Sequence, residues 1–227
     1  MTIAHHPEEA LLFDHAAGAL DEGAALAVAV HLAFCPECRD AVARMETLGG
    51  ALLDDIAPVA LGSQALDAVY ARITRMESRD VAARQPQTPP EQSEPLPAPL
   101  RPYVGGGMRS LAWRRAGRVR EARLALAGAG RWRASLVRMR GGAAVPAHTH
   151  AGTEYTIVLQ GGYSDATGRY APGDFACADP SLSHRPCADP GEECIVLAVQ
   201  DAPVRLTGAL ARLLNPILAS RFRSGRP

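Results

Sequence analysis

The sequence predicts an α + β protein of two domains, a small helical domain followed by an antiparallel β domain. Apolar residues recur every three to four positions in the first 80 residues, whereas after residue 103 they alternate at every second position. A proline-rich segment separates the two regions. The chain has 227 residues and is 47% hydrophobic, enough for two cores. Its 24 basic and 24 acidic residues cancel, and with this apolar content the chain is not of the disordered class.

Four helices are expected in the N-terminal region. Pro7 suits the first turn of a helix, and Glu8 and Glu9 favour the positive end of its dipole, while Gly18 weakens its end. The other three helices are expected at residues 22–34, 36–48 and 63–79. Because four short helices bury little apolar surface, we expect a structural metal ion to stabilise this domain.

The remaining boundaries follow from composition. Seven prolines between Arg84 and Pro102 predict an extended linker. Strands are expected at residues 131–139, 155–159 and 194–199, and short strands at this spacing predict a barrel or sandwich. The predicted division is a helical domain at 1–82, a linker at 83–102, a β domain at 103–206, and a C-terminal helix with a basic tail at 207–227.

The charges are divided unevenly. Residues 1–80 hold 13 acidic and 5 basic side chains, whereas residues 81–227 hold 11 acidic and 19 basic ones. An acidic domain is a poor DNA binder and complements a basic protein surface. The arginine-rich strands of the second half would suit a DNA-binding repressor, but their alternation with apolar residues is typical of the outer face of a barrel. The longest aliphatic stretch, 24–34, is too short to span a membrane and no signal peptide is visible, so a cytoplasmic location is expected.

A first group of metal-ligand residues lies in the helical region. His31, Cys35 and Cys38 are spaced so that they meet on one side of a helix or at a helical corner. Zinc takes four nitrogen or sulfur ligands in a tetrahedron, so a fourth must come from elsewhere. The alternative is a buried histidine beside an incidental or redox-active cysteine pair. The candidates for the fourth ligand are His5, His6 and His15, of which we favour His6 because it would tie the first helix to the others.

A second group lies in the β region. Two histidines two residues apart on a strand point the same way, and a carboxylate and a third histidine follow. Such ligands suit Zn²⁺, Mn²⁺ or Fe²⁺. The group consists of His148, His150, Glu154 and His184. Its spacing resembles the first motif of the cupins, which implies a jelly-roll barrel with a metal at its mouth. The second cupin motif departs from the pattern, because His184 comes ten residues after Asp174 and Ala188 replaces an asparagine.

A cupin metalloenzyme is the main alternative function. A dioxygenase or lyase acting on a small organic substrate requires an open metal position, which such a site can provide. No further cluster of acids and bases accompanies the four ligands, although Tyr155, Tyr163 and Tyr170 offer hydroxyl groups. A degenerate cupin that has lost its metal is a second alternative.

The whole chain resembles the ChrR type of zinc-dependent anti-sigma factor. The resemblance rests on the opening Met1-Thr-Ile-Ala-His-His, the Ala16–Leu20 segment, and the two ligand motifs in this order. It implies a non-enzymatic regulator whose helical domain sequesters an extracytoplasmic-function-type sigma factor, with no direct nucleic-acid or membrane binding. It further implies a cupin that senses singlet oxygen or related oxidants. The implied ligands are His6, His31, Cys35 and Cys38 for zinc, and His148, His150, Glu154 and His184 for the cupin metal.

Three further cysteines, Cys177, Cys187 and Cys194, have no role fixed by the sequence. Cys187 lies three residues after His184, close enough to the predicted metal for oxidation of its thiolate to matter. Small buried side chains in strands are the equally acceptable interpretation. We expect oxidant chemistry at the cupin site to change how the cupin sits on the helical domain and so to weaken the sigma-factor complex.

Overall fold

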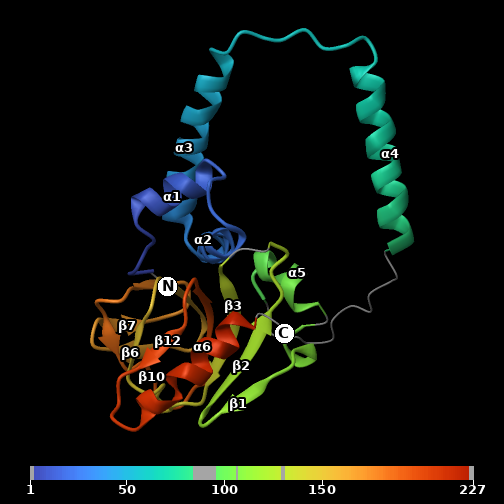
Figure 1. Cartoon of the computed structure of the whole chain (residues 1–227). Coiled ribbons are helices and arrows are strands. Elements are labelled where there is room, and N and C mark those ends of the chain that lie inside the picture. The colour runs from blue at the N-terminus through green and yellow to red at the C-terminus, as the bar shows by residue number, and fades with distance from the viewer. Residues whose placement is uncertain (1–2, 84–95, 106, 129–130, 225–227) are drawn as a thin grey trace.

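The computed structural model describes residues 3–83, 96–105, 107–128 and 131–224. Four N-terminal helices precede a β domain, as predicted. The helices are α1 (Glu9–Ala16), α2 (Glu22–Phe34), α3 (Pro36–Asp54) and α4 (Ala65–Ala83). Helix α2 lies against one end of the strands, with α1 and α3 beside it (Figure 1). No helix in the described ranges is long and apolar enough to cross a membrane.

A cysteine forms the corner between two of these helices. Cys35 ends α2 and caps the start of α3, where its Sγ accepts a hydrogen bond from the amide of Cys38 at 3.4 Å. Pro36 occupies the first position of α3, where the missing amide proton is not needed. The bounds of α2 and the start of α3 therefore agree with the sequence prediction. Helix α3 continues beyond residue 48, where it was predicted to end.

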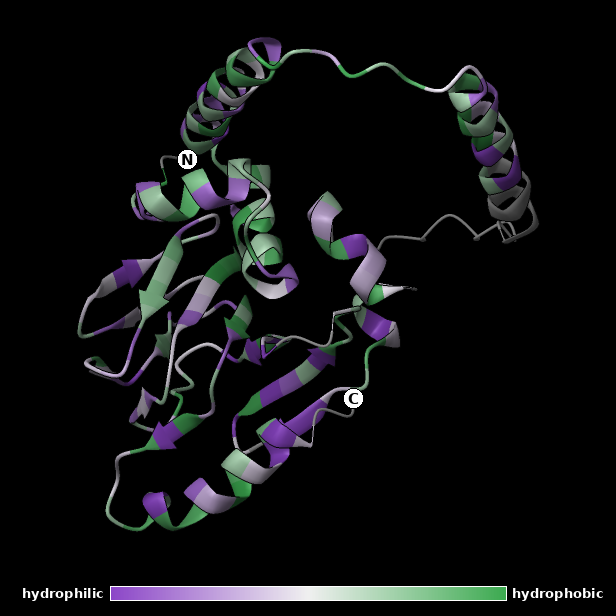
Figure 2. Ribbon diagram, turned by 45° about the horizontal axis from the view of Figure 1, so that its top comes forward, coloured by the Kyte–Doolittle hydropathy of each residue, from purple (hydrophilic) through white to green (hydrophobic). Residues whose placement is uncertain are grey.

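The fourth helix stands apart from the other three (Figure 1). Its apolar residues, Leu66, Val69, Tyr70, Ile73 and Met76, are exposed, so α4 does not join the other helices in the small core expected of a four-helix domain. The core of the helical region comes from α1, α2 and α3 alone. Its buried members are Leu12, Val28, Cys35, Cys38 and Val42. Figure 2 shows hydrophobic and hydrophilic bands alternating along α3 and α4.

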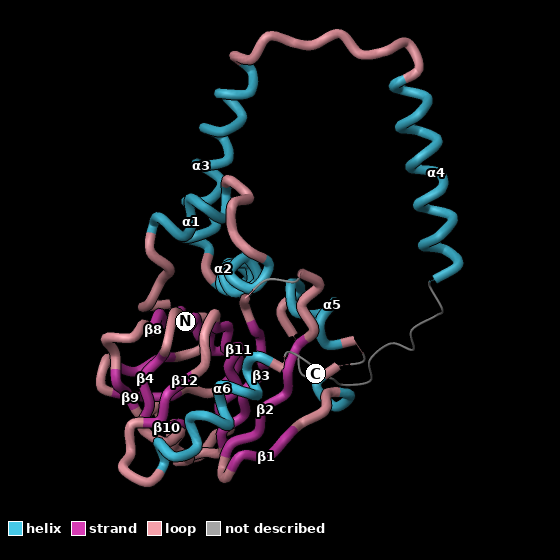
Figure 3. Tube along the Cα trace, in the orientation of Figure 1, coloured by secondary structure: helices cyan, strands magenta, loops and turns pink. Residues whose placement is uncertain are grey.

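The β domain consists of short antiparallel strands in three sheets (Figure 3). The largest sheet has the order β1-β2-β3-β11-β5-β8, and the smaller sheets have the orders β10-β6-β7 and β12-β4-β9. No hydrogen-bonded ladder among the described strands joins them into one closed barrel, which corrects the expectation of closure. The strands of the large sheet are β1 (Arg114–Ala116), β2 (Val119–Leu124), β3 (Arg133–Met139), β5 (Glu154–Gln160), β8 (Phe175–Ala178) and β11 (Cys194–Gln200). Those of the smaller sheets are β4 (His148–His150), β6 (Tyr163–Asp165), β7 (Gly168–Tyr170), β9 (Ser183–His184), β10 (Cys187–Ala188) and β12 (Val204–Leu206).

Helix α2 and the β domain share one hydrophobic core. Ala27 and Val30 on α2 are buried in the same cluster as Leu136, Ile157 and Leu197 on the large sheet. The start of α2 is also held by polar contacts. The carboxylate of Glu22 accepts hydrogen bonds from the amides of Ala127 and Gly128, and Asp21 accepts one from the Trp132 indole. The helical and β regions are therefore packed against each other rather than separated.

The end of the predicted linker is folded. Residues 84–95 lie outside the described residues, but a 3₁₀ turn (Ala98–Leu100) and α5 (Arg101–Val104) follow them. Leu100 and Val104 are buried in the core shared with α2. This differs from the expectation of an extended segment up to 102, because the apolar side chains after Pro97 find a place beside α2.

The C-terminal segment folds back onto β12. A 3₁₀ turn (Ala211–Leu214) leads into α6 (Asn215–Arg223), within the segment where a C-terminal helix is expected. The Asn215 side chain accepts a hydrogen bond from the amide of Leu206 and donates one to its carbonyl. Most of the predicted basic tail, residues 225–227, lies outside the described ranges.

Close packing of α2 against Trp132 and Val199 of the β domain leads to a stability prediction. A Cβ atom added to Gly23 would lie 2.5 Å from the Cβ of Trp132 and 3.2 Å from Val199. We expect Gly23→Ala to destabilise the protein by about 1–3 kcal/mol through overpacking, measured as a lower midpoint of thermal unfolding. Gly49→Ala, in α3 with open space around it, is the control and should be neutral or stabilising. An unchanged midpoint for Gly23→Ala would contradict this packing.

Candidate metal centres

The helical region brings four potential ligands together. One ligand atom from each of His6, His31, Cys35 and Cys38 lies within 4.8 Å of the others, and we call this group the helical cluster. The Nδ1 atom of His6 is 3.4 Å from the Cys35 Sγ and 3.3 Å from the Cys38 Sγ. Ligands of a tetrahedral zinc ion, at roughly 2.0–2.3 Å from it, stand roughly 3.3–3.8 Å apart. The separations in the cluster are close to this spacing.

The fixed tautomer of His31 supports metal binding at this cluster. Its Nδ1 lies 2.8 Å from the carbonyl oxygen of Gly173, and because a carbonyl only accepts, Nδ1 carries the proton and donates it. The Nε2 atom is then a lone-pair donor, and it is buried without a hydrogen-bond partner. A buried polar atom without a partner is costly unless something binds there. A metal ion would satisfy it.

The two thiols of the cluster are also buried. Burial, followed by the neighbouring Cys35, raises the pKa of Cys38 to about 12. Two thiolates this close are unfavourable without a cation, and a bound metal lowers the pKa of a coordinating thiol. The donor set of two sulfurs and two imidazoles is that of a structural zinc site.

Among the three histidines considered for the fourth position, the structure brings His6 into the cluster. His5 instead lies against Tyr170, with ring centroids 4.4 Å apart, and near Asp174. His15 lies on α1 and outside the group. Pro7 and the extended residues before α1 direct His6 toward the corner between α2 and α3.

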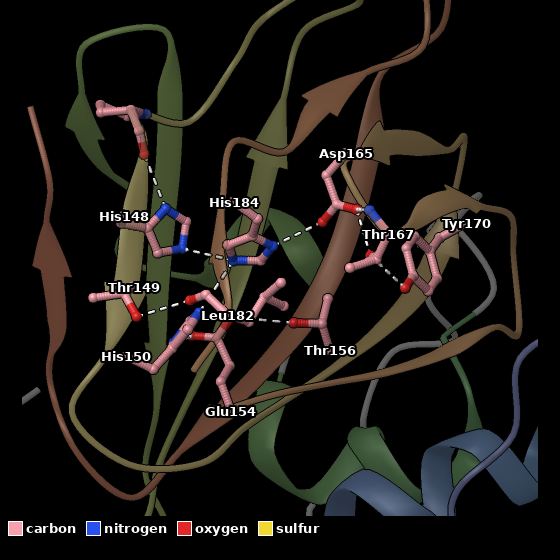
Figure 4. Close-up of polar contacts among 11 residues, drawn as sticks. His148, Thr149, His150, Glu154, Thr156, Asp165, Thr167, Tyr170, Leu182 and His184 are labelled. Carbon is pink, nitrogen blue, oxygen red and sulfur yellow. Dashed lines mark hydrogen bonds and ion pairs between the residues drawn. The ribbon is translucent and has the colours of Figure 1, made fainter. Parts of the chain in front are cut away.

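A second group is formed by three buried histidines of the β domain. His148 and His150 project from β4 to one side, and His184 stands opposite His148 on the neighbouring strand β9 (Figure 4). The Nε2 atom of His184 lies 3.1 Å from the Nε2 atoms of both His148 and His150. We call His148, His150 and His184 the histidine triad. The sequence predicted these three to converge from neighbouring strands, and they do.

The hydrogen bonds around the triad leave lone pairs facing one another. His148 Nδ1 donates to the Pro146 carbonyl at 2.9 Å, and His184 Nδ1 donates to the Asp165 carboxylate at 2.7 Å. With its proton on Nδ1, each of these two rings can offer the Nε2 lone pair to the centre. Burial, together with the neighbouring imidazoles, lowers the pKa of His150 to about 4, so it stays neutral near pH 7. The Nε2 lone pairs of His148 and His184, 3.1 Å apart, repel each other unless a cation lies between them, so the triad fits a metal ion.

Glu154 lies beside the triad rather than within it. It begins β5, and its Oε1 accepts a hydrogen bond from Thr156 while its Oε2 lies 3.7 Å from Nδ1 of His150 (Figure 4). Burial raises its pKa to about 7. The carboxyl group thus approaches the Nδ1 side of His150 and lies outside the triad, and its place as a metal ligand stays a prediction.

Two contacts at these sites were not predicted from the sequence. Asp165, whose carboxylate orients His184, is separated from it by two strands and an irregular loop, so no local spacing reveals the pair. The contact between the Gly173 carbonyl and His31 depends on packing between regions far apart in the sequence, so no local pattern reveals it. The five cysteines are all free, and Cys187 lies outside the triad.

Comparison with known proteins decides the family. The chain is 42% identical over 218 residues to the anti-sigma-E factor ChrR of Cereibacter sphaeroides, and the match covers 95% of this chain and 98% of that protein. The chain belongs to the ChrR family of anti-sigma factors. The predicted resemblance is thereby confirmed. A ChrR cupin-like domain model matches residues 110–204 and a zinc-finger model matches residues 9–39 of this ChrR-family chain.

A solved structure of a relative gives the same result. A crystal structure of Rhodobacter sphaeroides SigE in complex with the anti-sigma ChrR contains a chain 40% identical to this one, with a TM-score of 0.72. That match covers 88% of this ChrR homologue and 100% of the other chain. A cupin protein from Ralstonia eutropha is 13% identical, with a TM-score of 0.41, over 52% of this chain and 85% of its own.

Proposed function

We propose that this chain is an anti-sigma factor that sequesters an extracytoplasmic-function-type sigma factor through its N-terminal helices. Its relative in the SigE complex is the starting point. The main support from this chain itself is an exposed apolar surface. It covers the C-terminal half of α3, the connection that follows, and α4. The exposed members are Leu48, Leu52, Leu53, Ile56, Val59, Leu61, Leu66, Val69, Tyr70, Ile73 and Met76. We call them the exposed apolar set.

An exposed apolar surface of this extent supports a protein partner. Single apolar residues on a surface are ordinary, but contiguous ones mark interaction sites. The two helices that carry the set are held apart at the ends of a long connection, so a partner can lie between them (Figure 1). The surplus of acidic side chains in residues 1–80 complements a basic, nucleic-acid-binding partner such as a sigma factor.

The helical cluster is proposed as a structural zinc site. Bound zinc would tie the segment before α1 to the corner between α2 and α3 and contribute folding free energy. His6, His31, Cys35 and Cys38 would hold it. We propose residues 1–82 as the sigma-binding domain, 83–102 as the linker, 103–206 as the cupin sensor and 207–227 as a C-terminal extension. The chain would act in the cytoplasm, where sigma factors meet RNA polymerase.

The cupin is proposed as the part that senses singlet oxygen or related oxidants. Its triad, with Glu154, would hold Zn²⁺, Mn²⁺ or Fe²⁺, since imidazoles and a carboxylate suit each of these ions. His148 and His184 would coordinate through Nε2, because the Nδ1 of each donates to an acceptor that orients the ring. Metal analysis of the purified chain would identify the ions.

The proposal is tested by measuring release of the sigma factor. The full-length chain and the sigma factor of the same type from its own cell are mixed, and the complex is followed by fluorescence anisotropy before and after photochemical generation of singlet oxygen. We expect His148→Ala, supplied with enough zinc to fill the helical cluster, to bind the sigma factor with unchanged affinity and to release at least tenfold less of it on oxidation.

His15→Ala, a histidine outside both ligand groups, should behave as the unchanged chain does. Failure of the unchanged chain to bind any such sigma factor would reject the anti-sigma proposal. Normal release from the His148→Ala variant would reject the sensory role of the cupin.

A further inference from the structure

The segment that carries His6 is fixed by the β domain. The amides of Ala4 and His5 donate hydrogen bonds to Oδ1 of Asp174 at 2.8 and 3.0 Å. The amide of Phe175 donates to the carbonyl of His5 at 3.0 Å. Residues 4 and 5 thus run along the turn between β7 and β8, and His6 follows directly. The position of one member of the helical cluster depends on a turn of the cupin.

The same turn orients a second member. The carbonyl of Gly173 accepts the hydrogen bond from His31 Nδ1, and Gly173 has a φ of +92°. A Cβ at this position would lie 2.7 Å from Ile3 and 2.9 Å from the Cβ of Phe34. Metal-binding histidines are generally oriented by a partner on their other ring nitrogen, and losing that partner typically costs 10–100-fold in metal affinity. The turn therefore positions two ligands of the helical cluster, His6 through the backbone before it and His31 through its ring nitrogen.

A chain of contacts runs from this region to the histidine triad. His184 donates to the Asp165 carboxylate, which accepts hydrogen bonds from the amide of Thr167 at 2.8 Å and from its hydroxyl at 2.5 Å (Figure 4). The Thr167 hydroxyl lies 2.9 Å from the Tyr170 hydroxyl. The ring of Tyr170 packs on His5, next to His6 in sequence. Both ends of the segment Asp165–Phe175 thus touch residues that position potential ligands.

We propose that the segment Asp165–Phe175 couples the two centres, so that metal binding at the histidine triad raises the affinity of the helical cluster for zinc. This rests on the proposed metal binding at both sites. Holding His184 in place fixes Asp165, Thr167 and Tyr170, and through them the strand and turn that support His6 and His31. Energetic coupling between two binding sites is reciprocal and typically changes each affinity 5–150-fold.

The proposal assigns positioning roles to residues that touch no metal. It also connects the cupin physically to the helices. When the triad loses its ion, the contacts that hold His6 and His31 in position become weaker. Contact along a path is not by itself proof of coupling, so the test uses combined substitutions.

The experiment uses the full-length chain loaded with Co²⁺. Thiolate-to-cobalt charge-transfer absorption reports the helical cluster alone, because the triad and Glu154 offer no sulfur ligand. The affinity of the cluster is measured by titrating a chelator until this absorption is lost. Absence of the absorption in the unchanged chain would mean that the proposed metal site itself is wrong, which is a different outcome from failure of the coupling.

Emptying the triad is the first comparison. We expect His148→Ala to weaken Co²⁺ binding at the helical cluster about tenfold. Thr167→Val should weaken Co²⁺ binding at the cluster severalfold, because it interrupts the path of contacts. In the His148→Ala background it should cause no further loss of affinity. Thr207→Val, at an exposed threonine directly after β12 and outside this path of contacts, should have no effect. Equal affinities of the cluster in the unchanged chain and in His148→Ala would overturn the proposal, as would fully additive effects of His148→Ala and Thr167→Val.

The role of the Gly173 turn in metal binding is tested separately. We expect Gly173→Ala to weaken Co²⁺ binding at the helical cluster at least tenfold. Gly191→Ala is the matched control, because its φ of +95° imposes the same backbone strain while a Cβ there has open space. Unchanged affinity in a folded Gly173→Ala variant would overturn the role of the turn. If Gly173→Ala does not fold, Thr167→Val still decides the coupling.

Discussion

Replacing Cys38 by alanine should abolish sigma-factor binding, with at least a 100-fold loss of affinity. Its Sγ is buried beside His6 and Cys35, so its removal takes one of two sulfur ligands from the helical cluster. Zinc contributes about 10–16 kcal/mol to the folding of small zinc-finger peptides, which is more than the core of α1–α3 supplies by itself. The measurement is isothermal titration of the full-length variant with its sigma factor, together with zinc analysis.

The control for this substitution removes a thiol elsewhere. Cys177 lies on β8 with an exposed side chain and outside both ligand groups. Cys177→Ala should retain zinc and bind the sigma factor normally. A Cys38→Ala variant that keeps both zinc and sigma-factor affinity would contradict a role for this thiol as a ligand.

Charging the stripe on α4 should weaken the sigma-factor complex about as strongly without unfolding the chain. Val69 and Ile73 lie one turn apart and are 54% and 45% exposed, so Val69→Asp with Ile73→Asp removes no buried contact. Two interface residues worth about 2 kcal/mol each correspond to a loss of about 1,000-fold. Binding is measured by anisotropy and folding by circular dichroism.

The opposite face of the same helix offers the matched control. Ala68→Asp with Ala71→Asp adds the same charge and keeps the helix, but points away from the stripe. This control should reduce binding far less than the stripe variant. Equal losses of affinity in the two double variants would mean that the added charge alone weakens binding. Unchanged affinity in both would mean that α4 is not part of the interface.

The helices were predictable because their signals are local. Glu22–Phe34 is recovered in full, since Asp21 precedes its start and Pro36 follows its end. The four residues of the helical cluster were predicted as a set for the same reason, because three lie within eight positions of one another. The favoured choice of His6 over His5 and His15 agrees with the geometry, which alone could decide among neighbouring histidines.

The relations between regions were not predictable. An amphipathic pattern on α4 indicates an apolar face but not what covers it, so a common core was the natural and incorrect expectation. The packing of α2 on the sheets depends on the close approach of Gly23 to Trp132, for which no spacing in the sequence gives a signal. The contacts of Asp165 and Gly173 with the two histidine groups likewise arise only in the folded chain.

The central claim is that metal at the helical cluster holds the N-terminal helices in the form that binds a sigma factor. It is tested most directly by measuring sigma-factor affinity of the full-length chain as purified, after removal of metal by a chelator, and after return of one equivalent of zinc. The account predicts tight binding, its loss, and its recovery with zinc. A metal-free chain that binds the sigma factor as tightly as the zinc-loaded one would contradict it.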